Sequence, residues 1–475
     1  MFNINGIIIV SVLFPILGGL LVVLTGRLGG DTAKTAFLTA AVTLLLSFFA
    51  IYYTAAGRAA DFIVYMPMGM DFHLVGNMMC AYMAGAASFL SFIIMYYSQG
   101  YIEEGPYQTE FYATAMLFLG SMMGLVYSSN LVWLFVFWEM TAICSWRLVG
   151  YFRAKTDIAK ANKTFIITVF GALFLLLAIV DIAQTNGSLD LTLLNGYHIS
   201  VTAALFIILA AFSKSAIFPF SSWLPDAGVA PSPVTALLHA AVLVKIGVFA
   251  FAKIFSYIVL EIELAQFVMY IAAISSLIAG ASALKETNIK RIIAYSTISQ
   301  LGFIFLGIAA GGFIGFSGAF LFILMHGIAK GGLFLCAGII EHKTHTKDIT
   351  QMGGLIKIMP ITALSFGFCA LSVMGIPPFG GFFSKFMVFI AASEAAPWPV
   401  IAIFAVAAVF TLAYLTRLFY IIFLNENRKK YEAGAHEAPR QMLISVGVLA
   451  AFSLLLGVFV KLPLGYIYKM FGGFL

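Results

Sequence analysis

The sequence predicts an all-α polytopic membrane protein with about 14 transmembrane helices. Three observations indicate this fold class: 62% of the 475 residues are hydrophobic, only 10% are charged, and the mean hydropathy is +1.03. Such values are typical of membrane proteins. A helix that crosses the hydrocarbon core needs about 20 mainly apolar residues. Stretches of this kind lie at 5–25, 35–56, 76–98, 110–128, 131–152, 162–184, 199–219, 231–256, 264–284, 291–311, 313–340, 359–393, 398–424 and 442–468.

Two of these stretches, the first and the twelfth, need separate justification. We interpret 5–25 as a span and not as a cleaved signal peptide, because no basic residue precedes it and no small-residue cleavage pattern follows it. The stretch at 359–393 is long enough to contain a break. No large soluble domain fits between the spans.

The basic residues predict how the chain crosses the membrane. Short cytoplasmic loops concentrate Lys and Arg, and here the basic groups lie on alternate loops: Arg27 with Lys34, then the groups at 153–163, 285–291, 343–357 and 428–440. The other loops carry only Arg58, Lys253, Lys461 and Lys469. We therefore expect a multi-pass protein of the cell membrane with both termini outside the cytoplasm. The net charge of +6 follows from this topology, so no nucleic-acid partner is expected.

Six basic residues remain inside otherwise apolar spans. Each such residue costs about 2.5–3.5 kcal/mol at a helix centre, so we expect each to have a special role or a partner. Arg147 and Arg417 lie near span ends, where a long side chain can extend to the headgroups. Lysine, unlike arginine, can lose its proton when buried. The remaining four residues are therefore candidates for proton transfer: Lys214, Lys245, Lys330 and Lys385.

Three further titratable residues lie inside spans. Glu139, in Phe137-Trp138-Glu139-Met140, is the natural counter-charge for a lysine on a neighbouring helix, and a purely structural salt bridge is the alternative. His239 and His326 titrate near neutral pH. His326 and Lys330 are four residues apart and so share one helical face. A buried histidine can also serve only as an interhelical hydrogen-bond donor, and this alternative stays open for both.

Two spans combine a lysine with nearby proline. Pro219 follows Lys214, and Pro377 with Pro378 precedes Lys385. Proline removes a main-chain donor and disrupts the helix, so the seventh and twelfth helices are predicted to be broken. Paired breaks in two halves of a chain are typical of transporter repeats. We expect N-terminal helices 1–3 at 1–109, two inverted five-helix repeats at 110–256 and 257–425, and a last helix at 426–475.

The cysteines indicate packing and not a cofactor site. Cys80, Cys144, Cys336 and Cys369 all lie inside apolar spans, without the C-x-x-C spacing or neighbouring histidine of a metal or iron–sulfur centre. We expect no bound metal, no cofactor and no catalytic residue in this chain, so any electron transfer would belong to partner subunits.

Several motifs resemble the antiporter-like proton-channel family. The family includes the large membrane-arm subunits of complex I, the large subunits of Mrp-type Na⁺/H⁺ antiporters and the membrane subunits of energy-converting membrane-bound hydrogenases. The resemblance covers nearly the whole chain. The motifs are Trp138-Glu139, Phe212-Ser213-Lys214-Ser215, Trp223-Leu224-Pro225-Asp226-Ala227, Pro231 to His239, Lys290-Arg291 to Gln300, His326 to Lys330 and Gly380 to Lys385.

The resemblance implies roles for these residues. Glu139 and Lys214 would form a modulating ion pair, and His239 or Lys245, with Lys330, would form the middle of a hydrated lysine–histidine axis. Lys385 would connect this axis to the exit side, and Asp226 would lie in the loop after the broken seventh helix. The chain departs from the family at Gly76-Asn77, where Asp-Gly is common, and at Arg147, where an aliphatic residue is common.

The expected function is proton translocation in a redox-driven complex, either a membrane-bound hydrogenase or a complex I-like enzyme. Opening the Glu139–Lys214 pair would leave a positive charge beside the next lysine and so favour the release of its proton. The expected partners are other membrane and peripheral subunits, the lipid bilayer and H⁺. One alternative is the large subunit of an Mrp-type antiporter that also moves Na⁺, although only one deep acid is present. A second alternative is a substrate secondary transporter.

Overall fold

The computed structural model describes residues 3–102, 107–426 and 437–472. Arg428, Lys429 and Lys430, which belong to one of the predicted basic loops, lie outside the described residues. The contacts divide the chain into two units, which are described one at a time. Unit 1 comprises residues 1–95, 104–216 and 241–265, and unit 2 comprises residues 96–103, 217–240 and 266–475.

In the described part of the chain, twelve helices are long and apolar enough to cross a membrane. This confirms the predicted all-α polytopic class. Two further predicted spans, 199–219 and 359–393, contain the shorter apolar helices α7 (Val201–Lys214) and α14 (Pro360–Met374). A helix of 14 residues is only about 21 Å long, less than the hydrocarbon thickness of about 30 Å. The inverted repeat and its boundaries stay predictions.

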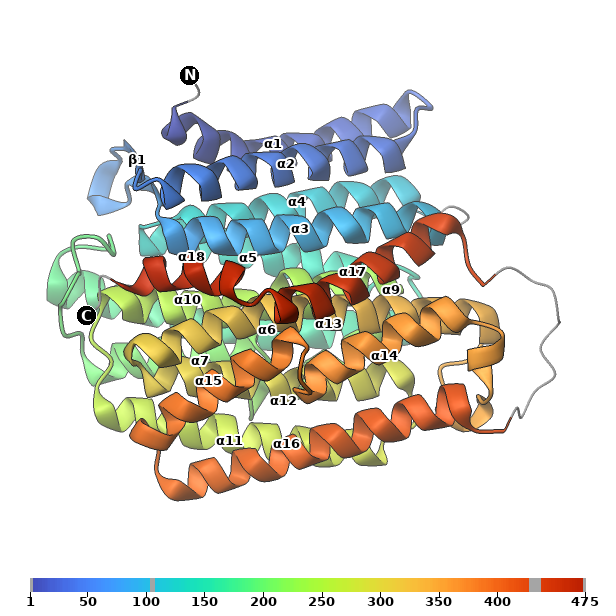
Figure 1. The fold of residues 1–475 in the computed structure, drawn as a ribbon. Helices are drawn as coiled ribbons and strands as arrows, with labels where there is room; N and C mark the ends of the chain where they lie inside the picture. Colours follow the sequence, from blue (N-terminus) through green and yellow to red (C-terminus); the bar gives the residue numbers. More distant parts are fainter. Residues whose placement is uncertain (1–2, 103–106, 427–436, 473–475) are drawn as a thin grey trace. The chain divides into compact units, whose positions relative to one another are not determined.

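Unit 1 contains the N-terminal helices, a hairpin and the buried lysines Lys214, Lys245 and Lys253. Helices α1, α2 and α4 of this unit run side by side (Figure 1). Its elements are α1 (Ile4–Arg27), α2 (Thr32–Ala55), β1 (Ala60–Val64), β2 (Phe72–Gly76), most of α3 (Met78–Tyr101), α4 (Gln108–Tyr127), α5 (Leu131–Val149), α6 (Lys155–Asn186), α7 and α10 (Leu243–Tyr257).

Side-chain caps fix where several of these helices begin. The side chains of Asn3, Asp31, Asn130 and Ser200 each accept a hydrogen bond from a main-chain N–H in the first turn of α1, α2, α5 and α7. Such caps satisfy donors that have no partner inside the helix. The short polar residues between the apolar stretches therefore determine the helix starts.

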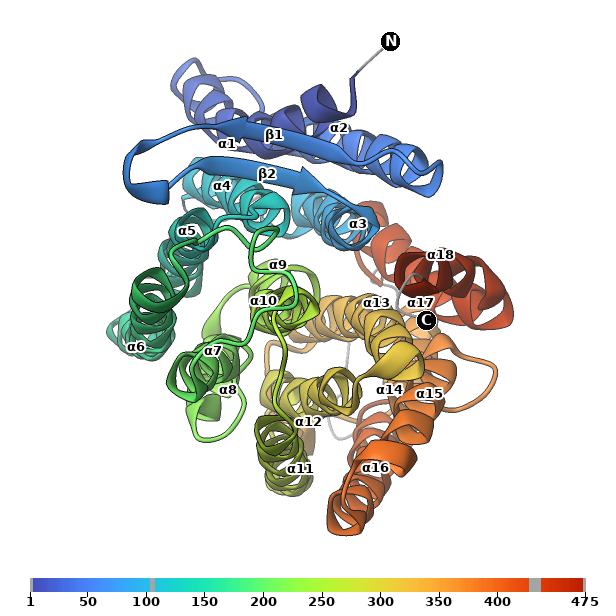
Figure 2. The same cartoon turned by 90° about the vertical axis from the view of Figure 1, so that its left-hand side faces the viewer.

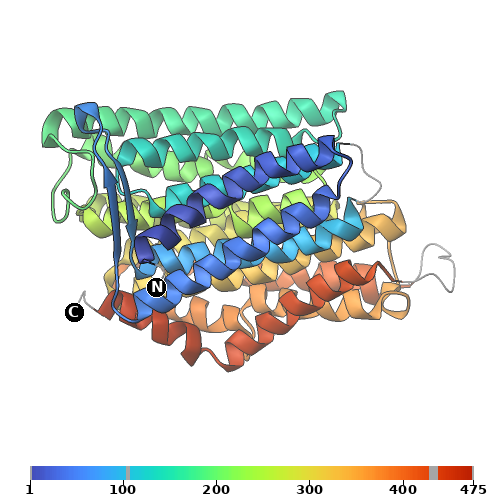
Figure 3. The ribbon, with the colours of Figure 1, turned by 90° about the horizontal axis from the view of Figure 1, so that it is seen from above.

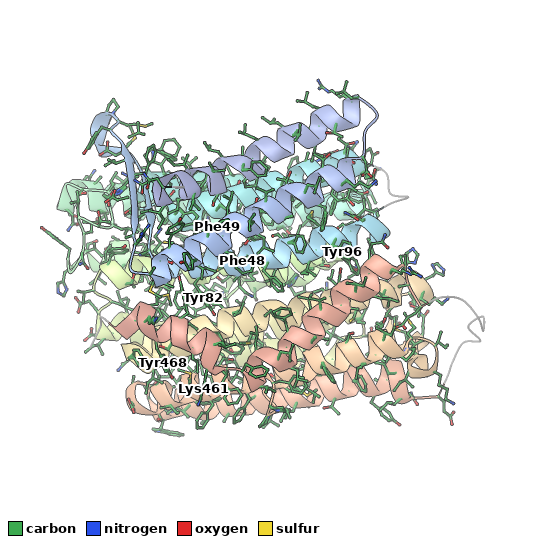
Figure 4. The ribbon with its side chains drawn as sticks, turned by 45° about the horizontal axis from the view of Figure 1, so that its top comes forward. Phe48, Phe49, Tyr82, Tyr96, Lys461 and Tyr468 are labelled. Atoms are coloured by element: carbon green, nitrogen blue, oxygen red, sulfur yellow. The ribbon has the colours of Figure 1, made fainter. Side chains whose placement is uncertain are left out.

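Small residues allow helices α1, α2 and α4 to approach closely. A Cβ added at Gly120 of α4 would lie 2.4 Å from Ile16 Cγ1, and one added at Gly19 of α1 would lie 2.9 Å from the Ala113 main-chain oxygen. Membrane helices associate mainly through such packing, because lipid is as apolar as the side chains. The outer face of α2 is apolar and exposed, including Phe48 and Phe49 (Figure 4), as expected of a surface that contacts lipid.

The sequence did not predict the β-hairpin between α2 and α3. Strands β1 and β2 pair antiparallel with Ala60 opposite Gly76 (Figure 2). The hairpin lies across one end of α1 and α2 (Figure 3). Gly76 is packed so closely on Ile8 that a Cβ there would lie 1.8 Å from Ile8 Cδ1. The hairpin is short and follows a long apolar span, so hydropathy alone gave no signal for it.

Unit 2 contains the remaining buried lysines and the two helices of the predicted span 359–393. Its elements are α8 (Trp223–Asp226), α9 (Ser232–Ala236), a π-helical turn (Leu237–Ala241), most of α11 (Ile262–Lys285), α12 (Ile289–Ala310), α13 (Gly312–Thr344), α14, α15 (Gly380–Ala395), α16 (Trp398–Phe419) with a π-helical turn (Tyr420–Leu424), α17 (Arg440–Val458) and α18 (Lys461–Phe471).

A span is confirmed at the predicted stretch 442–468, but it ends earlier than predicted. Helix α17 ends at Val458, and α18 begins at Lys461. Gly457 packs on the turn between α14 and α15, where an added Cβ would lie 2.1 Å from the Pro378 main-chain oxygen. Helix α18 buries Phe471 against α13, whereas Lys461 and Tyr468 are exposed (Figure 4). Apolar residues on both sides of the bend gave one continuous hydrophobic stretch in the sequence.

Candidate functional site

Lys214 lies at the last residue of α7 and is fully buried in unit 1. Its Nζ donates to the main-chain oxygen of Trp138 at 3.0 Å and lies 5.3 Å from the centre of the Trp138 ring. Glu139 is the next residue along α5, and its charge interacts with that of Lys214. In the described part of the chain the two side chains form no direct ion pair, and Glu139 Oε1 is buried without a hydrogen-bond partner.

The end of α7 is held between α6 and α10 by small residues. Ser213 Oγ donates to the Ile167 main-chain oxygen at 2.8 Å, and Ser215 Oγ donates to the Val244 main-chain oxygen at 3.0 Å. Gly247 of α10 lies directly against this turn, because an added Cβ would lie 2.5 Å from the Ala211 main-chain oxygen. The predicted motif Phe212 to Ser215 therefore positions Lys214 through both of its serines.

Helix α10 carries two buried lysines, of which the sequence identified one. Lys245 and Lys253 are each 1% exposed. Lys253 Nζ donates to the main-chain oxygens of Val126 at 2.7 Å and Ser128 at 2.6 Å, at the C-terminal end of α4. Such carbonyls favour a cation. The assignment of Lys253 to a loop was wrong; the apolar residues on both sides of it were the available signal.

Lys330 of unit 2 lies in a network of hydroxyl groups. His326 and Lys330 are buried on one face of α13. Lys330 Nζ donates to Ser296 Oγ at 2.5 Å and to the Ile293 main-chain oxygen at 3.3 Å. The Tyr414 hydroxyl also donates to Ser296 Oγ, at 2.8 Å. The lysine thus contacts neutral oxygens on α12, and Tyr414 of α16 extends the network; sequence reasoning did not identify Ser296 or Tyr414.

Lys385 lies just after the turn between α14 and α15. Its Nζ donates to the Val373 main-chain oxygen of α14 at 2.7 Å. The ammonium group also lies 5.1 Å from the centre of the Phe303 ring and 5.9 Å from that of Phe322. Phe322 precedes His326 by one turn of α13, and the two rings are 6.3 Å apart. Phe322 therefore lies beside both titratable groups.

His239 lies in the π-helical turn Leu237–Ala241 of unit 2. The ring is fully buried, and its centre is 4.3 Å from that of Phe334 on α13. Single π-helical turns inside helices are frequent at functional sites. His239 and Lys245 belong to one candidate span, Ser232–Tyr257, but fall in different units.

The first turn of α12 carries two cations that bind acids of unit 2. Lys290 is 1% exposed; its Nζ lies 2.7 Å from Glu341 Oε2 and donates to the Ala230 main-chain oxygen at 3.0 Å. Arg291 binds Asp226 and Glu286, each at 2.7 Å. A cavity of about 660 Å³ opens beside Glu341. Lys290 was assigned to a loop group in the sequence, so its burial is a second correction.

Both span-end arginines have protein partners and are not simply extended toward headgroups. Arg147 forms an ion pair with Glu110, and Arg153 binds the other oxygen of Glu110 at 2.7 Å. Arg417 donates to the main-chain oxygens of Leu284 at 2.8 Å and Glu286 at 3.2 Å, at the end of α11. The ion pair with Glu110 accounts for the charge of Arg147.

The predicted site residues thus fall into two groups. Glu139, Lys214 and Lys245 lie in unit 1, whereas His239, His326, Lys330 and Lys385 lie in unit 2. Within residues 3–102, 107–426 and 437–472, no group of three or more His, Cys, Asp or Glu side chains is placed to hold a metal ion. The four cysteines are buried and free.

Solved structures share this fold. The chain superimposes on a subunit of the Mrp complex from Dietzia sp. DQ12-45-1b with a TM-score of 0.90, over 99% of this chain and 97% of that one, at 22% identity. It superimposes on a chain of the membrane-bound sulfane sulfur reductase, an archaeal respiratory membrane complex, with a TM-score of 0.87, over 97% and 96% of the chains, at 23% identity. At these identities the likeness shows the fold.

Sequence comparisons identify the family. The Na⁺/H⁺ antiporter subunit A1 of Staphylococcus haemolyticus is 35% identical over 430 residues, which are 83% of this chain and 53% of that protein. The subunit A1 of Staphylococcus aureus strain JH9 is 34% identical over 434 residues. The chain spans about half the length of these relatives. The family described as NADH:quinone oxidoreductase/Mrp antiporter, transmembrane, matches residues 128–411. The chain therefore belongs to this family, as its motifs predicted.

Proposed function

We propose that this chain translocates protons through buried lysines as one subunit of a multi-subunit membrane complex. The observation that supports this most directly is the chemistry around the lysines. Lys214, Lys330 and Lys385 are buried and donate to main-chain oxygens or a serine hydroxyl. A lysine held by neutral oxygens can release its proton without leaving a buried carboxylate unpaired, whereas a fixed salt bridge opposes that release.

Glu139 supplies the control of this transfer. Its carboxylate is close enough to interact with Lys214, yet Lys214 Nζ bonds to the Trp138 oxygen. Formation or opening of a direct pair between them would change the uncompensated charge at Lys214. When the pair opens, the ammonium group of Lys214 is no longer neutralised and its charge favours the neutral form of Lys245. When the pair closes, Lys245 can bind a proton again.

The complex that drives this transport takes one of two forms. The relatives named Na⁺/H⁺ antiporter subunit A1 favour an Mrp-type antiporter, in which H⁺ movement is exchanged for Na⁺. A redox-driven complex, in which partner subunits hold the electron carriers, is the other form, and the fold shared with a respiratory complex supports it. Reconstitution in proteoliposomes distinguishes the two forms. An Mrp-type antiporter changes the pH of the liposome lumen in response to a Na⁺ gradient alone, whereas a redox-driven complex does not.

The decisive test is coupled transport by lysine variants. In proteoliposomes that contain the purified complex, K214A and K385A are expected to abolish the pH gradient, because each removes a titratable group from its unit. The matched control is K461A, since Lys461 is exposed on α18. If both variants assemble normally and pump at the wild-type rate, the proposal is wrong.

We also propose that both termini lie outside the cytoplasm and that residues 110–256 and 257–425 are inverted repeats. The basic loops support the orientation. Each proposed repeat contains one apolar helix too short to span, α7 or α14, next to a buried lysine. Labelling of cysteines introduced at Lys34 and Leu193 tests the orientation, since the four native cysteines are buried. Leu193 should react from outside and Lys34 only after permeabilisation.

A further inference from the structure

A cluster of three titratable residues lies where the hairpin of unit 1 meets the loop after α6. His73 of β2 lies between two carboxylates: Nδ1 is 2.5 Å from Asp190 Oδ2, and Nε2 is 2.9 Å from Asp61 Oδ1. The Asp61 side chain is 75% exposed, whereas those of His73 and Asp190 are 7% and 11% exposed. The imidazole ring therefore connects a carboxylate in water with a carboxylate inside the protein.

The main chain around this cluster is fixed by hydrogen bonds. Ser129 N–H donates to the His73 main-chain oxygen at 2.9 Å, and Leu191 N–H donates to the Ser129 main-chain oxygen at 3.1 Å. Ser129 Oγ and the Thr192 hydroxyl both donate to Asp190 Oδ1, at 2.9 and 2.7 Å. The link between α4 and α5 is thus held between the hairpin and the loop that carries Asp190.

The same link leads to the buried lysines of α10. Ser128 accepts the hydrogen bond of Lys253 through its main-chain oxygen, and the charge of Asp190 interacts with that of Lys253. Lys253 follows Lys245 by eight residues, which is about two helical turns and about 12 Å along α10. At 3.6 residues per turn the two side chains are about 80° apart around the helix axis. The titratable groups are therefore arranged in the order Asp61, His73, Asp190, Lys253 and Lys245.

The electrostatics around His73 favour the charged form of its ring. The hydrogen bond to Asp190 is the largest cause that raises the pKa of His73, and burial acts in the opposite direction. Burial acts to raise the pKa of Asp190, but hydrogen bonds from His73, Thr192 and Ser129 outweigh it and hold the pKa well below its usual range. The other titratable groups near the cluster are Lys253 and Tyr257 of α10 and Cys80 of α3.

We propose that Asp61, His73, Asp190 and Lys253 form a proton-transfer path between Lys245 and the membrane side that has few basic residues. This rests on the proposed function and adds a route for protons within unit 1. In the outward direction, Asp61 takes the proton of His73 Nε2 and releases it to water. The neutral imidazole keeps its Nδ1 proton, so the ring turns over until its free nitrogen faces Asp190. That nitrogen then takes the proton that Asp190 receives from the Lys253 ammonium group. One proton leaves the protein, and Lys253 becomes neutral until Lys245 supplies another.

The alternative role for this cluster is structural, since the hydrogen bonds also attach the hairpin to unit 1. The two roles give different results with H73Q, because glutamine retains hydrogen bonding but cannot carry a proton. The matched control is H198Q: His198 also binds a carboxylate, Glu261, at 2.7 Å, but its side chain is 65% exposed. The assay is coupled proton transport by the purified complex in proteoliposomes.

If the path exists, H73Q and K253M lower the transport rate about tenfold or more, as expected when a proton-transfer group is removed, and H198Q leaves it unchanged. D190N also lowers the rate, because asparagine cannot carry a proton, and it shifts the pH profile of the remaining transport to lower pH, because His73 loses the charge that stabilises its protonated form. A purely structural cluster would lower the amplitude and the thermal stability without shifting the profile.

Wild-type transport and an unshifted pH profile in folded H73Q and D190N complexes would overturn this path. K385A distinguishes that outcome from failure of the proposed function. If K385A abolishes transport while H73Q does not, only the path is wrong. If neither variant has an effect, the proposed function is wrong as well.

Discussion

Replacing Gly247 by alanine tests whether close packing of α7 on α10 positions Lys214. An added Cβ would lie 2.5 Å from the Ala211 main-chain oxygen and 2.3 Å from Ser215 Oγ, whereas ordinary contacts are at 3.4 Å or more. The Ser215 side chain can rotate, but the main-chain oxygen belongs to the last turn of α7. The two helices must therefore separate by about 0.9 Å at this point.

Overpacking of this kind costs about 1–3 kcal/mol, and alanine recovers up to about 1 kcal/mol through its higher helix propensity. The net loss of stability is therefore about 0–3 kcal/mol. The functional effect is expected to be larger than the loss of stability, because the displaced turn ends at Lys214, whose bond to the Trp138 oxygen is 3.0 Å long. The hydrogen bond of Ser215 to the Val244 oxygen is broken by the same shift.

The assay combines thermal unfolding of the purified complex with coupled transport in proteoliposomes. The control is G447A on α17, because an added Cβ at Gly447 meets nothing within 4 Å. We expect G447A to be at least as stable as the wild type and fully active, and G247A to retain its fold but lose most of its transport. A G247A complex with wild-type stability and transport would refute the argument that this contact positions Lys214.

Two further predictions concern His73 and the Lys290–Glu341 pair. Because the pKa of His73 is raised in the folded protein, its contribution to stability is present below the unfolded value of about 6.5 and is lost as the pH rises through the folded pKa. Hydrogen exchange of residues 60–76 should therefore accelerate as the pH rises through the folded pKa of His73, and H73Q should remove this extra pH dependence. An equal pH dependence of exchange in the wild type and H73Q would contradict a stabilising role of charged His73. For the Lys290–Glu341 pair, E341Q should destabilise the complex more than K290M. E341Q leaves the charge of the buried Lys290 ammonium group without a carboxylate, whereas K290M leaves Glu341 bound to Lys347 at 3.2 Å. Thermal unfolding measures both variants, and the reverse order would show that Lys290 is not held by this pair.

The sequence predicted the membrane helices well because hydropathy is a local property. Twelve spans and the two shorter apolar helices correspond to stretches that the residues alone identify. The hairpin at 60–76 and the bend between α17 and α18 were missed. In both cases the determining contacts are tertiary: Gly76 packs on Ile8, and Gly457 packs on the turn near Pro378.

The site was predicted in part for a similar reason. A lysine such as Lys214 or Lys385 is conspicuous in an apolar stretch, because burying a charge is expensive. Lys253 and Lys290 were not recognised as buried, since each lies near the end of a helix and the sequence does not show which chain segment covers it. The cover comes from distant residues, the Val126 and Ser128 oxygens for Lys253 and Glu341 for Lys290.

The sequence by itself determined the membrane class, the family and the lysines that carry charge inside the spans, because these depend on composition and on residue identity at fixed spacing. Only the tertiary structure decided what each charge bonds to. It places Lys330 against Ser296, gives Arg147 the carboxylate of Glu110, and brings His73 between Asp61 and Asp190. Hydrogen bonds and ion pairs act only within a few ångströms, and residues far apart in sequence reach that distance only when the chain folds.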